Sequence, residues 1–302
     1  MERRTVAVVL NYRTARETVQ AVQTLAASRS PVATIIVVDN ASGDGSVATL
    51  RAELGDARLV EAEHNGGFAA GCNQGIREAL RLGADRVLLL NSDARIEPDA
   101  LGALERALDE NPRVGIVGPA VVERADPQVV QSLGMGYTLS TGRMRLHGFG
   151  RRHDALTVPA LRQVDGVSGC AMLVRREVFE RVGLFFEDYF FAFEDLDLCL
   201  RARAAGFATV CVGSAVVRHE GSASIGRTSP QRIYYATRNH LLLAARTSPP
   251  GPAVARWVRT ASIVALNLAF VLTTASVPRR EGLSAFRRAL ADHRARRYGR
   301  GA

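Results

Sequence analysis

The chain has 302 residues, of which 47% are hydrophobic, so it can bury the core of one large domain. Its four cysteines are far apart and form no C-x-x-C pair, which excludes a disulfide framework and a cysteine zinc site and favours reduced thiols. The charge of +9 comes from residues 226–302, which carry 14 arginines against two acidic residues, whereas residues 1–225 have a net charge of −3.

Apolar runs and helical patterns alternate along the first half of the chain. The run at 5–10 is short and β-branched, so it predicts a buried strand and no export signal. Buried strands separated by helices are typical of a parallel, Rossmann-like sheet covered on both faces. Strands are predicted at 5–10, 33–38, 57–60, 86–90 and 114–117, and helices at 14–27, 46–54, 67–82 and 98–111.

Polar residues follow several of these strands, at the sheet edge where such folds bind ligands. Asn11 and Tyr12 follow the first strand, Asp39 the second, and Asn91, Ser92 and Asp93 the fourth. A carboxylate at the position of Asp93 can hold Mg²⁺ or Mn²⁺ and, through the ion, a diphosphate. It can equally serve as a turn or cap residue.

A glycine turn at 65–67 opens the predicted helix 67–82. The first strand is not followed by G-x-G-x-x-G, and the glycine turn lacks a P-loop lysine, which argues against a dinucleotide dehydrogenase or a P-loop NTPase. The N–H groups of Asn65, Gly66 and Gly67 could bind a phosphate or ribose, or the segment could simply be a tight turn.

An acidic cluster marks the second half of the chain. Residues 120–165 suggest loops or hairpins, and strands are predicted at 169–174, 208–212 and 215–217. Glu194, Asp195 and Asp197 follow an aromatic run and open a helix, where acidic residues are favoured by the helix dipole. Partial burial would raise a carboxylate pKa and suit a general base. His219 is a candidate metal ligand only if it lies beside Asp93, where it could complete the coordination shell of the ion.

The last quarter is predicted to be mostly helical and strongly basic. The stretch 260–277 is uncharged but contains Asn267, and it is close to the lower limit of about 17–25 residues for a membrane span. An interfacial or buried packing helix is therefore favoured. The arginine-rich end, 287–300, suits anionic lipid or a polyprenyl diphosphate, and nucleic acid is not expected because the sequence contains no nucleic-acid motif.

Several segments, in this order, resemble family 2 glycosyltransferases of the GT-A fold, and most closely the bacterial rhamnosyltransferase branch. The resemblance covers about residues 5–245. It implies an α/β fold with a Rossmann-like mixed, mostly parallel sheet flanked by helices, a catalytic domain at 1–225 and a helical extension at 226–302. The matching segments are 8–12, 37–42, 65–73, 89–93, 166–172, 193–201, 218–219 and 238–239.

The resemblance also implies roles for individual residues. Asp195 is expected to be the catalytic base, supported by Glu194, and Asp93 and His219 are expected to hold Mg²⁺ or Mn²⁺. Asn91 stands where the family has the first Asp of its D-x-D motif, which leaves one carboxylate fewer for the ion. The acceptor is expected at Gly169, Asp197 and Arg238, and the nucleotide sugar at Asn11, Tyr12, Asp39, Asn65, Gly67, Asn91 and Ser92.

The implied activity is inverting sugar transfer from a nucleoside diphosphate to a glycan or polyprenyl-linked hydroxyl in cell-envelope polysaccharide synthesis. The branch favours dTDP-L-rhamnose, with UDP- and GDP-sugars left open, and a cytoplasmic enzyme at the inner face of the membrane. A nucleotidyltransferase and a non-catalytic nucleotide-sugar-binding protein are the alternatives. The first usually has a basic glycine loop after strand one, and the second needs no Glu194–Asp195 pair. The oligomeric state stays open.

Overall fold

The computed structural model describes residues 3–156, 159–221, 229–248, 251–273 and 277–301. The strands are β1 (Thr5–Asn11), β2 (Thr34–Asp39), β3 (Arg58–Glu61), β4 (Arg86–Asn91), β5 (Ala94–Ile96), β6 (Val114–Glu123), β7 (Val130–Ser132), β8 (Met135–Tyr137), β9 (Met144–Leu146), β10 (Leu161–Val164), β11 (Ala171–Arg175) and β12 (Ala208–His219). The helices are α1 (Ala15–Ala26), α2 (Ser46–Glu53), α3 (Gly67–Arg81), α4 (Ala100–Asp109), α5 (Arg176–Val182), the 3₁₀ helix η1 (Glu187–Tyr189), α6 (Glu194–Ala204), α7 (Pro230–Arg246), α8 (Ala253–Thr273) and α9 (Arg279–Arg294).

One mixed sheet forms the centre of the molecule, with strand order β10-β12-β6-β11-β4-β1-β2-β3. The strands from β4 through β1 and β2 to β3 pair in parallel, as do β6 and β12, so the expected mostly parallel sheet is confirmed. β11 is antiparallel to both of its neighbours, β4 and β6. The two strands expected at 208–212 and 215–217 are one continuous strand, β12, with a register shift between Val212 and Val216.

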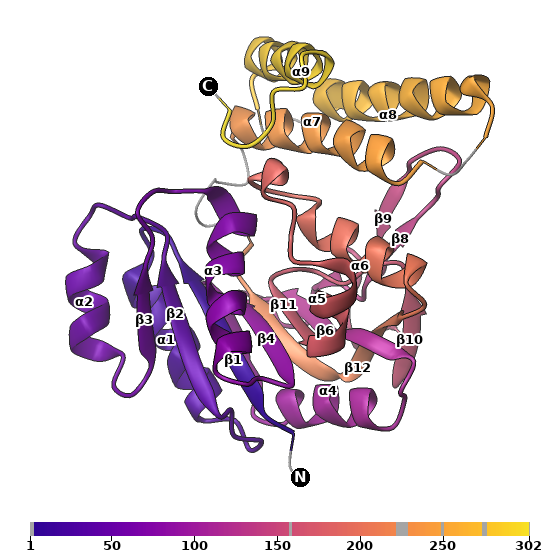
Figure 1. Ribbon diagram of the computed structural model, residues 1–302. Coiled ribbons are helices and arrows are strands. Elements are labelled where there is room, and N and C mark those ends of the chain that lie inside the picture. Colours follow the sequence, from indigo (N-terminus) through magenta and orange to yellow (C-terminus); the bar gives the residue numbers. More distant parts are fainter. Residues whose placement is uncertain (1–2, 157–158, 222–228, 249–250, 274–276, 302) are drawn as a thin grey trace.

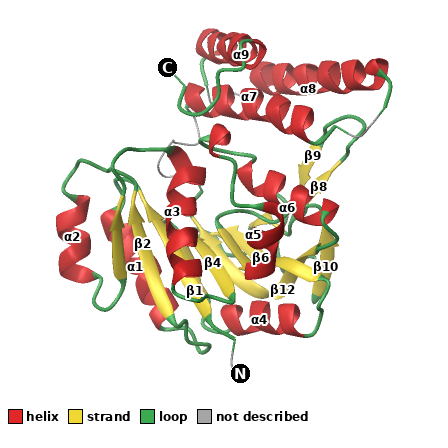
Figure 2. Cartoon of the chain, in the orientation of Figure 1, coloured by secondary structure: helices red, strands yellow, loops and turns green. Residues whose placement is uncertain are grey.

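Helices cover both faces of this sheet (Figures 1 and 2). In β1, Ala7 and Val9 face a core shared with α1, α2 and α4, whereas Val6 and Val8 face a core shared with α3, α5 and α6. Because neighbouring side chains of a strand point to opposite faces, a strand covered on both sides must be apolar throughout. This explains the uninterrupted apolar run at the start of the chain.

The C-terminal helices form a separate layer above the sheet domain (Figure 1). α7 packs against both α8 and α9, around a small core that includes Ile233, Val271 and Phe286. α7 also contacts η1, next to the start of α6. The four cysteines are free and buried, as expected for reduced core thiols.

Candidate active site

The first corner of the site joins the end of β4 to the end of β12. The short strand β5 follows the Asn91–Asp93 turn and pairs antiparallel with β12, which places His219 opposite Ala94. His219 Nε2 consequently lies 3.2 Å from Asp93 Oδ1 and 3.4 Å from Asn91 Nδ2. The structure thus brings together the two residues expected to hold a metal ion, although they are far apart in the sequence.

Gln131 of β7 sets the tautomer of His219. Its Nε2 donates to the His219 carbonyl oxygen at 2.8 Å, so its amide oxygen faces Nδ1 of the same histidine at 2.9 Å. Nδ1 then carries a proton, and Nε2 is directed at the Asp93 carboxylate, so the neutral ring would have its lone pair on Nε2. Two acceptor atoms at this distance repel each other unless a proton or a cation lies between them, so imidazole and carboxylate fit a divalent ion here.

The protein contributes few ligands to such an ion. Within the described ranges, no group of three His, Cys, Asp or Glu side chains is arranged to hold a metal. Mg²⁺ is commonly held by one or two protein ligands together with substrate phosphates and water, so a two-residue site is chemically adequate when a diphosphate is present.

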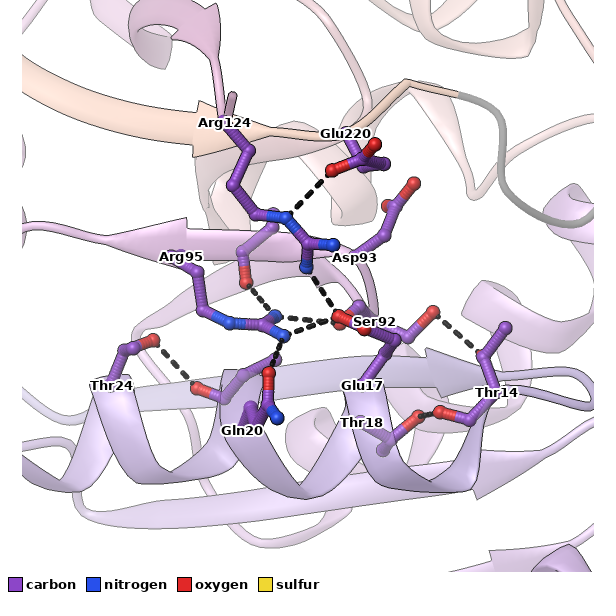
Figure 3. Close-up of polar contacts among 12 residues, drawn as sticks. Thr14, Glu17, Thr18, Gln20, Thr24, Ser92, Asp93, Arg95, Arg124 and Glu220 are labelled. Atoms are coloured by element: carbon purple, nitrogen blue, oxygen red, sulfur yellow. Dashed lines mark hydrogen bonds and ion pairs between the residues drawn. The ribbon is translucent and has the colours of Figure 1, made fainter. Parts of the chain in front are cut away.

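A charged network surrounds Ser92 and Asp93 of the Asn91–Asp93 turn (Figure 3). Arg95 donates to the carbonyl oxygens of Ser92 and Ala94, at 3.0 and 2.9 Å, and also pairs with Glu17 of α1. Arg124 binds the same carboxylate and reaches Glu220 at 2.7 Å. Burial would raise the pKa of Glu17, but hydrogen bonds and charge from Arg124 and Arg95 lower it overall. The turn is therefore tied to α1, β6 and β12.

The second corner contains Asp195, in the first turn of α6. Its carboxylate accepts from the N–H groups of Gly169 at 2.9 Å and Leu196 at 2.7 Å. The carbonyl oxygen of the next residue, Cys170, accepts from the N–H of Asn91 at 2.8 Å. Two consecutive residues thus connect the Asp195 carboxylate to the end of β4. Burial raises the pKa of the Cys170 thiol to about 12, and the nearby charges of Asp93 and Asp195 add to this effect.

The pKa values of Glu194 and Asp195 are raised to different extents although the two residues are adjacent. Burial raises the pKa of both, and the Asp195 carboxylate raises that of Glu194 further, to well above its ordinary value. The N–H groups of Gly169 and Leu196 counteract the effect of burial on Asp195. A side-chain oxygen of Glu194, Oε2, is buried without a hydrogen-bond partner. The protonated form is therefore favoured more strongly at Glu194 than at Asp195, whose carboxylate is stabilised by two N–H groups.

The raised pKa of Glu194 predicts a pH-dependent gain in stability for Glu194→Gln. Stability that depends on protonated Glu194 is complete below its unfolded pKa and is lost as the pH rises through the higher folded pKa. The variant lacks this loss, so its Tm should exceed that of the wild type at alkaline pH, and the gap should narrow towards pH 5. Calorimetric scans over this range measure the effect, and a gap that does not change with pH would contradict it.

The third corner is the expected nucleotide site, at the ends of β1 and β2. Asn11 donates to the Asp39 carboxylate at 2.6 Å, and Ser42 donates to it through both its N–H and its hydroxyl. Asn11 and Asp39 are both buried, whereas Tyr12 is half-buried and carries the Arg13 guanidinium 5.2 Å from its ring centroid. A cavity of about 470 Å³ opens beside them, lined by residues 13–17, 44–46 and 49.

Several N–H groups of the turn at 65–67 and of the start of α3 are bonded within the protein. Gly66 N–H donates to Asn40, Gly67 N–H to Asn65, and Phe68 N–H to the Phe190 carbonyl oxygen at 2.6 Å. Gly67 has φ +86°, and a Cβ there would lie 2.3 Å from the Phe190 oxygen, so only glycine fits. Because the Gly67 N–H group is already bonded within the protein, it is not available to a nucleotide sugar as expected, whereas the binding of nucleotide sugar by Asn65 stays a prediction.

Three other expected ligands also have internal roles. Asp197 has no exposed surface and binds Tyr189 at 3.0 Å and Arg201 at 2.7 Å, so it cannot meet an acceptor as expected. Arg238 is equally buried and faces the η1 segment, so it does not touch an acceptor either. Ser92 is buried and accepts from the Thr14 hydroxyl at 3.0 Å, which leaves it little surface for a ligand.

Some residues whose contacts support the site were not predicted from the sequence. Gln131 lies in a segment without a recognisable pattern, and Arg95 and Glu17 look like ordinary surface charges in the sequence. Asn239 stands in a segment that matched the family, but no role was expected for it. Only Asn239 had a signal that could have drawn attention to it.

Comparison with known proteins gives consistent matches. Residues 3–240 match the profile of the family described as "Glycosyltransferase like family 2". The chain is 30% identical over 255 residues to the N-acetylglucosaminyl-diphospho-decaprenol L-rhamnosyltransferase of Mycobacterium tuberculosis, covering 78% of this chain and 82% of that protein. It is 27% identical over 229 residues to the dTDP-rhamnosyl transferase RfbF of Shigella flexneri, covering 72% of each. The mannosyltransferase PcManGT of Pyrobaculum calidifontis, solved with GDP-Man and Mn²⁺, aligns with a TM-score of 0.58 and 20% identity over 98% of this chain and 84% of that one.

Proposed function

Because the chain belongs to glycosyltransferase family 2 and has the expected GT-A fold, we propose that this glycosyltransferase moves L-rhamnose from dTDP-L-rhamnose with inversion at the anomeric carbon. The observation that carries the proposal is the link through Gly169 and Cys170, which connects the Asp195 side chain to the turn that carries Asp93. Residues 1–225 would form the catalytic unit and residues 226–302 a supporting helical unit.

Asp93 and His219 would hold Mg²⁺ or Mn²⁺ against the donor diphosphate. The bound ion would neutralise the negative charge that develops on the departing nucleoside diphosphate. Gln131 would keep His219 in its ligating tautomer, and Arg95 would keep the Asn91–Asp93 turn in place. Asn91 would contribute its amide and no carboxylate, so the site carries less negative charge than one with two Asp residues.

Asp195 would remove the proton from the acceptor hydroxyl as that oxygen attacks the anomeric carbon. The carboxylate is held by the N–H groups of Gly169 and Leu196, which favour its ionised form against the effect of burial and fix its direction. Protonated Glu194 would add no second negative charge beside it. A single displacement then inverts the configuration without a covalent sugar–enzyme intermediate.

The nucleobase and the acceptor are assigned by position and by relatives. Tyr12 and the cavity that begins at the next residue, Arg13, would receive the nucleobase, and Asn11 would hold the Asp39 carboxylate at the end of β2. The relative from Mycobacterium tuberculosis is named for a polyprenyl diphosphate acceptor, which supports a lipid-linked acceptor here. Such an acceptor would place the enzyme in the cytoplasm at the inner face of the membrane.

A donor panel tests this assignment through stability. Free ligand at about 100 times its Kd stabilises a protein by about 2.7 kcal/mol, so binding is readable as a rise in Tm. We expect dTDP-L-rhamnose to raise the Tm more than UDP- or GDP-sugars, and the rise to depend on Mn²⁺. A larger rise with a UDP-sugar, or equal rises with and without Mn²⁺, would contradict this donor or this metal role.

Helix α8 would hold the enzyme against an anionic membrane without crossing it. Within the described residues, it is the helix long and apolar enough to span a bilayer. Its inner side is tied down, since Arg259 binds Tyr137 at 2.7 Å and Asn267 binds His240 at 3.0 Å. A spanning helix would break these contacts. Its outer side is apolar and exposed, at Val254, Trp257, Val258, Ala261, Ala265 and Leu272.

Vesicle binding can be followed directly, because Trp257 is the only tryptophan and is 77% exposed. Its emission should shift to shorter wavelength when vesicles containing phosphatidylglycerol are added. Replacing Val258 and Leu272 by Ser should weaken cosedimentation about tenfold, since each buries apolar surface in the membrane interface. Phe149→Ser is the matched control. Phe149 is an exposed aromatic residue outside α8, and this variant should bind vesicles as the wild type does. Unchanged Trp257 emission would contradict the assignment.

A further inference from the structure

The segment that leads into Asp195 has an unusual backbone. Phe190, Ala192 and Phe193 all have positive φ values, of 57°, 68° and 74°. Side chains with a Cβ are rarely found in this conformation, which persists only where surrounding contacts impose it. Phe193 is the residue immediately before helix α6, so the backbone of this segment determines where the helix begins and where Asp195 points.

One side chain of α7 holds most of this backbone. Asn239 Nδ2 donates to the carbonyl oxygens of Tyr189 and Phe191, both at 2.6 Å, and of Ala192 at 3.0 Å. Asn239 is fully buried, so these bonds are shielded from water. The two hydrogens of a single amide group are therefore shared among the carbonyl oxygens at three of the four positions from 189 to 192.

Arg238 sets the orientation of that amide. Its Nε donates to Asn239 Oδ1 at 3.0 Å, which directs the Asn239 NH₂ group towards the loop. The same guanidinium reaches the carbonyl oxygens of Asp188 and Tyr189 at 3.3 and 3.4 Å. The Arg238–Asn239 pair thus supplies the hydrogen bonds that the buried carbonyl oxygens of an irregular backbone would otherwise lack.

Aromatic contacts from the same helix support the loop. Phe190 stacks on Tyr235, with ring centroids 5.2 Å apart, and Phe193 stacks on His240 at 5.0 Å. On its opposite side, the Phe190 carbonyl oxygen accepts from Phe68 N–H of α3. The loop is consequently held between α7 and α3, and α7 provides the side chains.

We propose that Asn239, oriented by Arg238, is a positioning residue that holds the 189–193 loop so that Asp195 is aimed for proton transfer. The inference rests on the proposed function, in which Asp195 is the base. It gives the C-terminal helices a role in the catalytic step. Through the Arg238–Asn239 pair, α7 shapes the active site although this pair does not touch substrate.

The test compares Asn239→Ala with the wild type and with Thr247→Val. Thr247 lies at the end of α7 and binds Arg259 and Leu243, away from the loop, so its loss controls for general loosening of the helical layer. Asn239→Ala should lower kcat about 100-fold, as expected for a misplaced catalytic group, with donor KM changed less than about threefold. Its pH profile should shift, because Asp195 loses its fixed surroundings. Thr247→Val should leave kcat, donor KM and the pH profile unchanged.

Amide hydrogen exchange provides a readout that does not depend on activity. Exchange at residues 189–196 should increase in Asn239→Ala and stay at the wild-type rate in Thr247→Val. If Asn239→Ala folds poorly, Ala192→Gly added to it relieves backbone strain and should restore folding without restoring kcat. Wild-type kcat, or unchanged exchange at 189–196, in a folded Asn239→Ala would overturn the proposal. A wild-type protein with no transferase activity would refute the proposed function. Amide hydrogen exchange would still test whether Asn239 holds the 189–193 loop.

Discussion

Asp195→Asn is expected to lower kcat about 10³-fold, since a positioned general base typically contributes about 10²–10⁴-fold. The amide keeps the size of the carboxylate, but its single oxygen can accept from Gly169 or from Leu196 and not from both, and it cannot take a proton from the acceptor hydroxyl. Donor binding should stay within about threefold of the wild type, because the Asp93 and Asp39 corners are unchanged. Steady-state transfer and calorimetric donor titration on the same preparation measure the two effects.

Glu194→Gln is the matched control for this prediction. Glu194 is adjacent, acidic and buried, but its raised pKa keeps it neutral, so an uncharged amide should resemble the native state. We expect its kcat to stay within a few-fold of the wild type. If Glu194→Gln lost activity and Asp195→Asn retained it, the two roles would have to be exchanged. Full activity in both variants would remove the base from this pair.

Asp93→Asn is expected to lower kcat by about 10²–10³-fold and to abolish the response to Mn²⁺, because it removes the carboxylate that faces His219 Nε2. The amide would leave the ion without the negative charge of Asp93, so that the neutral imidazole would be the stronger ligand of the two. Titration of activity with Mn²⁺ measures the effect. Activation by Mn²⁺ with wild-type affinity in Asp93→Asn would contradict the metal site.

Gln131→Ala tests whether His219 binds the metal ion beside Asp93. It releases His219 from its fixed tautomer without removing a ligand, and such supporting residues typically contribute about 10–100-fold to metal affinity. The variant should need more Mn²⁺ but reach nearly the wild-type kcat at saturation. An unchanged Mn²⁺ requirement would show that His219 does not serve the ion.

The sequence predicted the sheet well because its central strands are apolar on both faces. The run at 86–90 and the polar residues after it were recognisable, and so was the acidic cluster at 194–197. The direction of β11 could not be predicted, since an apolar pattern does not distinguish parallel from antiparallel pairing. The small strands β7 to β9 are too short to show a period.

The candidate site was predicted in part, and the errors share one physical cause. Asp197 and Arg238 were expected to bind an acceptor, but sequence patterns do not reveal that a charged side chain is fully buried and paired internally. Gln131 was missed because a lone glutamine has no signal. The Asp93–His219 pair could be proposed only on condition of the fold, since the β5–β12 pairing brings the two residues together.

The anomeric configuration of the product tests the central claim most directly. The purified protein would be incubated with dTDP-L-rhamnose, Mn²⁺ and a polyprenyl diphosphate-linked N-acetylglucosamine acceptor, and the product analysed by NMR. The account predicts one new glycosidic bond, with the anomeric configuration opposite to that of the donor, and no product after chelation of the metal. Retained configuration, release of pyrophosphate in place of dTDP, or undiminished transfer without metal would contradict it.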